Sequence, residues 1–220
     1  MIQQALNEIK STIPHGVELC AVSKYHPLQA LQEAYDAGQR IFGESHVQEL
    51  QAKFPQLPHD IEWHFIGHLQ TNKVKYIAPY IGLIHSVDTE KLLLEINKQG
   101  IKNDRSIPIL LQLHVAQEDT KYGFTPDECK ELLLTLRDKD LRGINIRGIM
   151  CMATNTDDTQ RISQDFETAY QFYQWAKSEV LTSPTFSIRS WGMSNDYLLA
   201  IQHGSNMIRV GSKIFGPREY

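Results

Sequence analysis

The feature that most constrains the fold is an alternation of short apolar segments with segments of helical pattern, repeated along the chain. Each apolar segment is near-continuous in character, and most end in Gly, Ser, Asp or Lys. Such segments are typical of parallel strands that are covered on both faces. We therefore predict eight strands, over residues 18–24, 40–44, 62–67, 82–88, 107–115, 146–152, 186–192 and 207–212.

Helical patterns separate these strands. One opens with Pro27, a favoured first position of a helix, and stops at Gly38, a favoured residue after a helix. Another begins with Thr125 and Glu128 at the spacing of a capping box. Further helices are predicted over about 2–11, over 46–53, 69–78, 89–99 and 195–203, and along the apolar stripe Ile162, Phe166, Ala169, Tyr173, Ala176 and Val180.

Strands that alternate with helices predict an α/β fold, and two closures compete: a doubly wound open sheet and a (β/α)8 TIM barrel. Eight units favour the barrel, although 220 residues is compact against the typical size of about 250. The first strand is not followed by G-x-G-x-x-G, which weakens the case for a dinucleotide-binding sheet. We predict one barrel domain over residues 1–220 with an extra N-terminal helix.

Composition excludes several other classes of protein. With 41% hydrophobic residues the chain has enough apolar surface to bury, and its net charge of −4 argues against a broad nucleic-acid surface. We find no apolar stretch of about 18 residues and no secretory leader at the start. Cys20, Cys129 and Cys151 are an odd, widely spaced set, which predicts reduced thiols in a cytoplasmic protein.

The C-terminal ends of the strands, where barrels build their active sites, carry a candidate anion site. Gly192 and Ser194 follow the seventh strand, and Gly211 and Ser212 follow the eighth. Barrel phosphate sites commonly use these two loops and the N-terminus of a short helix, with Ser194 also able to cap its own helix. Ordinary turn glycines and caps are the alternative interpretation.

Lys24 ends the first predicted strand and faces the same mouth. Partial desolvation would lower its pKa and expose a nucleophilic amine that forms a Schiff base with an aldehyde or ketone. The alternative is a lysine that extends from the rim into water. A ligand with both a carbonyl and a phosphate would suit Lys24 and the anion site together, and pyridoxal 5′-phosphate (PLP) and sugar phosphates are such ligands.

Other polar residues give weaker signals. Arg209 lies between Ile208 and Val210, so it faces into the barrel if those two face outward, either toward a ligand or into an ion pair. His64 and His68 lack the further ligands of a zinc site, so no metal site is predicted. The remaining candidates, His85, His114 and His203, are predicted to be hydrogen-bonded structural histidines.

The sequence resembles the YggS/PROSC family of PLP-binding proteins, also called PLP homeostasis proteins. The resemblance runs from residue 21 to the last residue. It rests on AVSK (21–24), RIFGESHVQEL (40–50), WHFIGHLQTNKVK (63–75), IHSVD (84–88), EDTKYGF (118–124), GIM (148–150), WGMSNDYLLAI (191–201) and IRVGSKIFGPREY (208–220).

This resemblance implies an alanine-racemase-like barrel without the second β domain, with PLP at its mouth. It makes Lys24 the Schiff-base lysine and places Arg209 at the pyridine nitrogen. The remaining cofactor-binding residues that it implies are Ser45, His64, Ile66, Gly67, Met193, Ser194, Gly211 and Ser212.

The chain also departs from the family pattern. Ser45 stands where the family usually has Asn, and its shorter side chain can lose a contact to the cofactor. Ser212 replaces a usual Thr and keeps the hydroxyl. Trp191 replaces a more usual Met, and Tyr25 stands where Thr or another small residue is common. The lysine, the arginine and the anion site are retained.

The resemblance implies a non-catalytic role: reversible PLP binding, with buffering or delivery to apo PLP-dependent enzymes. Racemases of this fold share the arginine but add a catalytic tyrosine from a second domain, which we do not expect in this chain. An arginine donor also disfavours protonation of the pyridine nitrogen and so weakens carbanion chemistry. We expect a monomer, and Lys121 is a candidate second amine. A weak amino-acid racemase and a Schiff-base sugar-phosphate aldolase are the alternatives.

Overall fold

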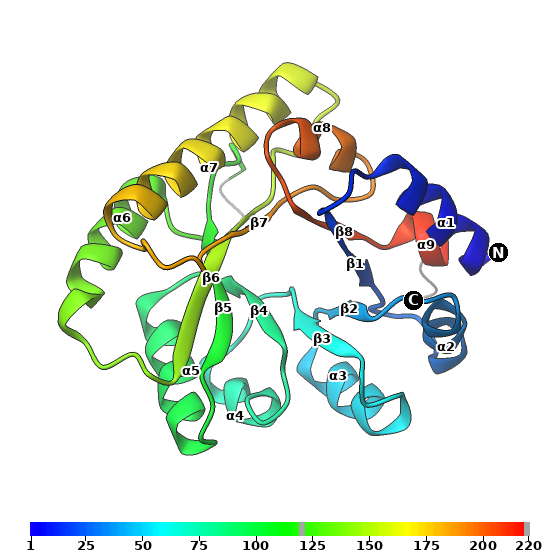
Figure 1. The fold of residues 1–220 in the computed structure, drawn as a ribbon, viewed down its shortest axis with the longest axis horizontal. Coiled ribbons are helices and arrows are strands. Elements are labelled where there is room, and N and C mark those ends of the chain that lie inside the picture. Colours follow the sequence, from blue (N-terminus) through cyan, green and yellow to red (C-terminus); the bar gives the residue numbers. More distant parts are fainter. Residues whose placement is uncertain (119–121, 218–220) are drawn as a thin grey trace.

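The computed structural model describes residues 1–118 and 122–217, and its eight parallel strands form a closed barrel in sequence order (Figure 1). The strands are β1 (Glu18–Val22), β2 (Ile41–Glu44), β3 (Glu62–Phe65), β4 (Leu83–Val87), β5 (Ile107–Leu113), β6 (Ile144–Cys151), β7 (Ile188–Ser190) and β8 (Met207–Val210). The prediction of a (β/α)8 barrel is confirmed, and the doubly wound alternative is excluded because β8 pairs with β1.

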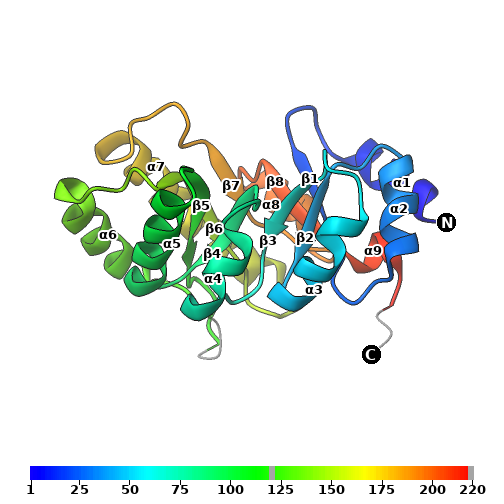
Figure 2. The ribbon, with the colours of Figure 1, turned by 90° about the horizontal axis from the view of Figure 1, so that it is seen from below.

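Helices surround the strands on the outside, as the edge-on view shows for α3 to α6 (Figure 2). They are α1 (Ile2–Thr12), α2 (Leu28–Asp36), α3 (Val47–Lys53), α4 (Val74–Ile77), α5 (Glu90–Lys102), α6 (Pro126–Thr135), α7 (Thr159–Glu179), α8 (Tyr197–Gln202) and α9 (Ser212–Phe215), with short 3-10 turns at Phe54–Gln56, Thr71–Lys73 and Leu136–Asp138. The predicted extra helix is α1, which lies beside α2 and α9 (Figure 1). In the described part of the chain, no helix has the length and apolar character needed to span a membrane.

Local sequence signals explain several helix ends. Thr125 and Glu128 form the predicted capping box at the start of α6. Gly38 follows α2 with a φ of +88°, the left-handed conformation that glycine adopts without strain. Pro27 is the N-cap of α2 and not its first helical residue, because its ψ of 159° is still extended. The helix therefore begins one residue later than predicted.

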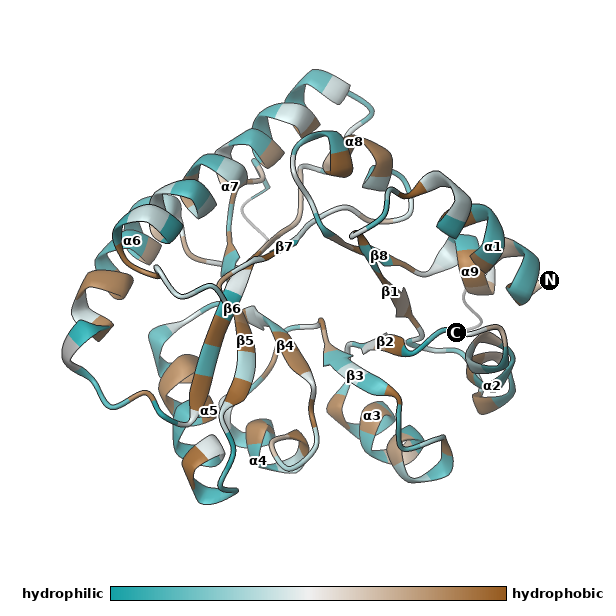
Figure 3. Cartoon of the chain, in the orientation of Figure 1, coloured by the Kyte–Doolittle hydropathy of each residue, from teal (hydrophilic) through white to brown (hydrophobic). Residues whose placement is uncertain are grey.

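The core has two parts. A large apolar cluster fills the space between the strands and the helices, and a small one inside the barrel contains Leu83, Leu110, Met150 and Met207. Figure 3 shows apolar residues mostly along the strands and on the helix sides that face them. Ile208 and Val210 belong to the outer cluster, so the period of two turns Arg209 inward, as predicted.

Several strands end earlier than the apolar segments of the sequence predicted. β1 stops at Val22 because Lys24 and Tyr25 form a turn, in which Tyr25 has a φ of +67°. β7 stops at Ser190, and Gly192 follows with a φ of +95°. Lys24 is therefore a turn residue just beyond the strand, and not the last residue of the strand as predicted.

A glycine contact between α5 and the start of β6 gives a test of this packing. A Cβ at Gly100 would overlap the carbonyl oxygen of Gly143. Ala normally stabilises a helix over Gly by about 1 kcal/mol, whereas overpacking costs about 1–3 kcal/mol. The net prediction is that Gly100→Ala lowers the free energy of unfolding in urea, by up to about 2 kcal/mol. The exposed Lys98→Ala on the same helix should change it by less than about 0.5 kcal/mol, and a stabilised Gly100→Ala would contradict the contact.

Candidate functional site

The predicted site residues gather on one arc at the C-terminal ends of five neighbouring strands: β7, β8, β1, β2 and β3. The register sets this order, because Ala21 of β1 pairs with Val210 on one side and Val22 pairs with Gly43 on the other. The loops on the arc carry Met193 and Ser194, then Gly211 and Ser212, then Lys24, then Ser45, and then Ile66 and Gly67. Arg209 and His64 lie inside the barrel, where both are buried.

Glycines allow these loops to approach one another closely. A Cβ on Gly67 would lie 2.5 Å from the backbone oxygen of Ser45, so the loops after β2 and β3 touch through backbone atoms. A Cβ on Gly211 would lie 3.1 Å from the oxygen of Val22, which brings the loop after β8 against the end of β1. The arc therefore presents backbone groups at positions where side chains would separate the loops.

The two loops that are predicted to bind an anion, after β7 and β8, contact each other directly. The hydroxyl of Ser194 accepts a hydrogen bond from the backbone N–H of Gly211 at 3.3 Å. Ser194 does not cap α8 as predicted, because Asp196 is the N-cap residue and its carboxylate accepts from the N–H of Met193 at 2.6 Å. This turn leaves the Ser194 hydroxyl beside the start of α9.

The short helix α9 completes this part of the site. It begins at Ser212, and the N–H groups of its first residues have no acceptor within the helix. The Ser212 side chain is exposed and that of Ser194 is half-buried, so both hydroxyls can reach a ligand. Hydroxyls and backbone N–H groups at a helix start suit a phosphate group.

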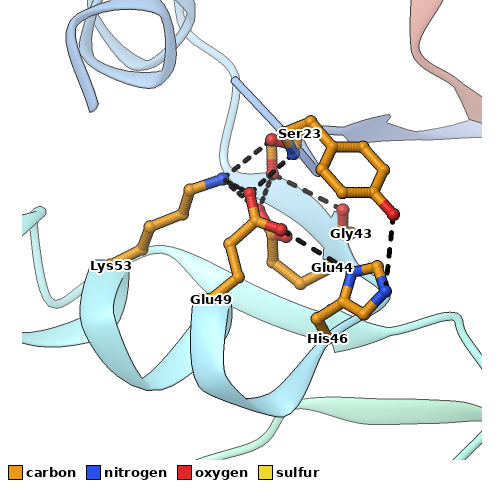
Figure 4. A network of polar contacts seen from close by, with 7 residues as sticks. Ser23, Gly43, Glu44, His46, Glu49 and Lys53 are labelled. Carbon is orange, nitrogen blue, oxygen red and sulfur yellow. Dashed lines mark hydrogen bonds and ion pairs between the residues drawn. The ribbon is translucent and has the colours of Figure 1, made fainter. Parts of the chain in front are cut away.

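Lys24 is half-buried, and the residues on both sides of it are held by one polar cluster (Figure 4). The backbone oxygen of Ser23 accepts from Lys53 Nζ at 2.8 Å, and the N–H of Tyr25 donates to Glu49 Oε1 at 2.6 Å. The Ser23 hydroxyl also donates to Glu44 Oε1 at 2.6 Å. These bonds fix the strained turn that carries Lys24.

The ammonium of Lys53 stands at the centre of this cluster, 2.8 Å from Glu44 and 2.7 Å from Glu49. Lys53 is 6% exposed and Glu44 is fully buried. Burial raises the pKa of the Glu44 carboxyl to about 7, against the opposing effect of Lys53. Sequence analysis missed this cluster, although the spacing of Glu49 and Lys53 on a predicted helix was a usable signal.

Arg209 is held by three hydrogen bonds inside the barrel. Its Nη1 donates to both the backbone oxygen and the hydroxyl of Ser190 at 2.7 Å, and its Nη2 donates to the oxygen of Cys151 at 3.0 Å. A guanidinium has five N–H donors, so two remain without an acceptor among the described residues. Within those residues no carboxylate lies at ion-pair distance, so the predicted ion-pair alternative is not found there.

The buried histidines lie below the mouth. Both ring nitrogens of His64 are hydrogen-bonded. Nε2 lies 3.0 Å from Glu62 Oε1, and Nδ1 lies 2.9 Å from His85 Nε2. His85 reaches Ser190 with its other nitrogen at 3.0 Å, which agrees with its predicted structural role. A contact of His64 with a cofactor stays a prediction, and Lys121 lies outside the described residues.

Comparison with known proteins shows the family. The protein-family model described as 'Alanine racemase, N-terminal domain' matches residues 1–219 of this sequence. The pyridoxal phosphate homeostasis protein of Pasteurella multocida is 34% identical over 232 aligned residues, which cover 100% of this chain and 98% of that protein. This chain belongs to the pyridoxal phosphate homeostasis protein family.

Two solved structures of a relative agree with this family. PipY of Synechococcus elongatus without PLP has a TM-score of 0.92 at 35% identity, and with PLP bound it has a TM-score of 0.88 at 34% identity. Each covers 98% of this chain and 100% of the PipY chain. Alanine racemase of E. faecalis, at 16% identity and a TM-score of 0.77, shares the fold, and the likeness covers 57% of its chain.

The departures from the family pattern have local consequences. Tyr25 takes the left-handed conformation, and its hydroxyl lies 3.4 Å from His46 Nε2 at the rim. Trp191 is fully buried in the outer core, and its indole N–H has no hydrogen-bond partner among the described residues. Ser45 is half-buried against Gly67.

The buried Glu44 carboxyl predicts a specific dependence of stability on pH. Its pKa is raised from 4.5 to about 7, so the folded chain binds this proton more tightly than the unfolded chain does. Stability from this group is therefore lost as pH rises from about 4.5 to about 7, by about 3 kcal/mol in all. Urea unfolding of Glu44→Gln should lack this component, whereas exposed Glu131→Gln should keep it. Parallel profiles for wild type and Glu44→Gln would refute the raised pKa.

Proposed function

We propose that this chain binds PLP at the barrel mouth through a Schiff base with Lys24 and acts in PLP homeostasis as a reversible carrier. One observation carries the proposal: an amine, an anion site and an arginine with spare donors lie on adjacent strands. These groups match the aldehyde, the phosphate and the pyridine nitrogen of PLP. The family membership and the PLP-bound structure of PipY support the same ligand.

Each part of the cofactor has a matching group in this chain. Ser194, Gly211 and Ser212 would bind the phosphate, because their hydroxyls and backbone N–H groups meet at the start of α9. Arg209 would donate to the pyridine nitrogen with one of its two remaining N–H groups. Lys24 would supply the amine. The rim residues Ser45, Ile66, Gly67 and Met193 would border the ring.

The charge of Arg209 favours a carrier over an enzyme. Bound PLP supplies an electron sink, which works best when an acidic partner protonates its ring nitrogen. A guanidinium is a permanent cation that only donates, so a second positive charge beside it is disfavoured. Lys24 can hold an aldehyde and release it to another amine without carbanion chemistry.

The recipients that we propose are apo PLP-dependent enzymes, reached by a monomeric carrier in the cytoplasm. The three cysteines are buried, and burial raises the pKa of Cys20 and Cys129 to about 12. Inert thiols of this kind suit a reducing compartment. The likeness to alanine racemase keeps a weak racemase as the second candidate function.

Removal of the Lys24 amine tests the proposed linkage. Wild-type protein mixed with PLP should show a near-visible absorption band, and borohydride should fix PLP on the peptide that contains Lys24. Lys24→Ala should lose both signals, because the substitution removes the amine that we propose forms the Schiff base. Lys73→Ala, which changes a lysine at the same end of the barrel, should keep them. A band retained in Lys24→Ala, or PLP fixed on another lysine, would refute the proposal.

Hydrogen exchange at the α-carbon separates the carrier from the racemase. Added L-alanine in D2O with the PLP-loaded protein should keep its α-hydrogen over hours by NMR, because Arg209 disfavours protonation of the ring nitrogen and so weakens the stabilisation of a carbanion. Transfer of PLP to an apo-aminotransferase, measured by recovered aminotransferase activity, should proceed in the same buffer. Rapid exchange of the α-hydrogen with inversion of configuration would favour the racemase and overturn the carrier role.

A further inference from the structure

A chain of hydrogen bonds crosses the interior of the barrel and ends on Arg209. It runs from Glu62 to His64 on β3, to His85 on β4, and across the barrel to Ser190 on β7 and Arg209 on β8. The four links measure 3.0 Å, 2.9 Å, 3.0 Å and 2.7 Å. We refer to these five residues as the interior relay.

The two ends of the interior relay determine where its protons lie. Arg209 can only donate, and an ionised Glu62 can only accept. Glu62 therefore requires the His64 proton on Nε2, which leaves His64 Nδ1 to accept from His85 Nε2. His85 Nδ1 must then accept the hydroxyl proton of Ser190. Each imidazole nitrogen and the Ser190 hydroxyl then have a partner, and each imidazole carries a single proton.

The reverse direction leaves a buried group unsatisfied. A proton on His85 Nδ1 would point at the Ser190 oxygen, which already accepts from Arg209. The Ser190 hydroxyl proton would then have no acceptor among the described residues. Because Ser190 and His85 are fully buried, an unpaired hydroxyl there would cost more than in water. A second cation at His85 is disfavoured as well, since burial and Arg209 lower the pKa of this imidazole.

The far end of the relay is accessible from outside. Glu62 begins β3 at the end of the barrel opposite the mouth, and its side chain is 55% exposed. Gly82 makes room for it, because a Cβ there would lie 2.7 Å from Glu62 Cγ. The hydrogen bond from His64 holds the pKa of the Glu62 carboxyl below its usual value, which keeps this end an acceptor.

We propose that Glu62, His64, His85 and Ser190 are positioning residues that hold Arg209 against the pyridine nitrogen of the bound cofactor, through one fixed direction of hydrogen bonding. The inference rests on the proposed function, since it assigns a purpose to the orientation of Arg209. It also revises the sequence-based expectation for His64. His64 acts on the cofactor through Arg209, which lies three hydrogen bonds away along the relay.

The first test needs no cofactor. In uniformly 15N-labelled apo-protein, long-range 1H–15N spectra should show His64 and His85 each neutral with the proton on Nε2. In Glu62→Ala a measurable fraction of His64 should carry its proton on Nδ1, whereas Glu18→Ala, at the same end of the barrel, should match wild type. A proton on Nδ1 of His85 in wild type, or unchanged tautomers in Glu62→Ala, would overturn the relay.

The second test measures the effect of the relay on bound PLP. With PLP labelled with 15N in its ring, the nitrogen resonance of the bound cofactor should shift in Glu62→Ala and Ser190→Ala relative to Glu18→Ala. Affinity for PLP should fall roughly fivefold in Glu62→Ala, the loss typical of one net hydrogen bond. Circular dichroism and urea unfolding check that each variant is folded.

The outcomes separate this inference from the proposed function. If wild type binds PLP at Lys24 but the ring resonance and affinity are the same in Glu62→Ala and Glu18→Ala, the positioning role is wrong and the carrier proposal stands. If wild type fails to bind PLP at all, the carrier proposal is wrong, and with it the role assigned to the relay. A shifted ring resonance in both relay variants, with normal folding, supports the inference.

Discussion

The pairing of β8 with β1 is the contact on which the rest of the structure depends. It closes the barrel, and it brings together residues from opposite ends of the chain: Lys24 lies beyond β1, whereas Gly211 and Ser212 follow β8. An open sheet with the same strands would leave the amine of Lys24 and the proposed anion site on two distant edges. Closure also creates an interior where a polar group is shielded from water, which gives the bonds of Arg209 their strength.

Two buried polar clusters then orient the two groups that we propose contact the ligand, Lys24 and Arg209. Lys53, Glu44 and Glu49 hold the residues on either side of Lys24, and the interior relay holds Arg209. Both clusters are costly, since burial opposes the charge on Glu44 and on Arg209. The proposed function explains why this unfavourable burial is retained. Each cluster removes rotational freedom from a group that, in this proposal, contacts a small ligand.

Sequence patterns predicted the fold better than the support of the site. Eight apolar segments and the period of two were enough for the barrel and for the inward direction of Arg209, because these follow from strand geometry. The predicted strands were too long at their C-terminal ends. The pattern of apolar residues does not reveal a positive φ such as that of Tyr25, which ends the extended conformation after β1. The partners of Glu44 and the hydroxyl contact of Ser194 depend on how α3 and the β7 loop pack, and spacing along the chain does not encode that packing.

The contents of the barrel interior support the proposal that the interior relay serves a bound ligand. Leu83, Leu110, Met150 and Met207 form an apolar cluster, which shows that apolar side chains pack well in this space. The buried residues His85, Ser190 and Arg209 are polar, and their burial is unfavourable unless every donor and acceptor is paired. Apolar side chains of the same volume would often be at least as stable. Arg209 nevertheless keeps two N–H groups unpaired among the described residues, and an acceptor supplied from the mouth would complete its hydrogen bonding.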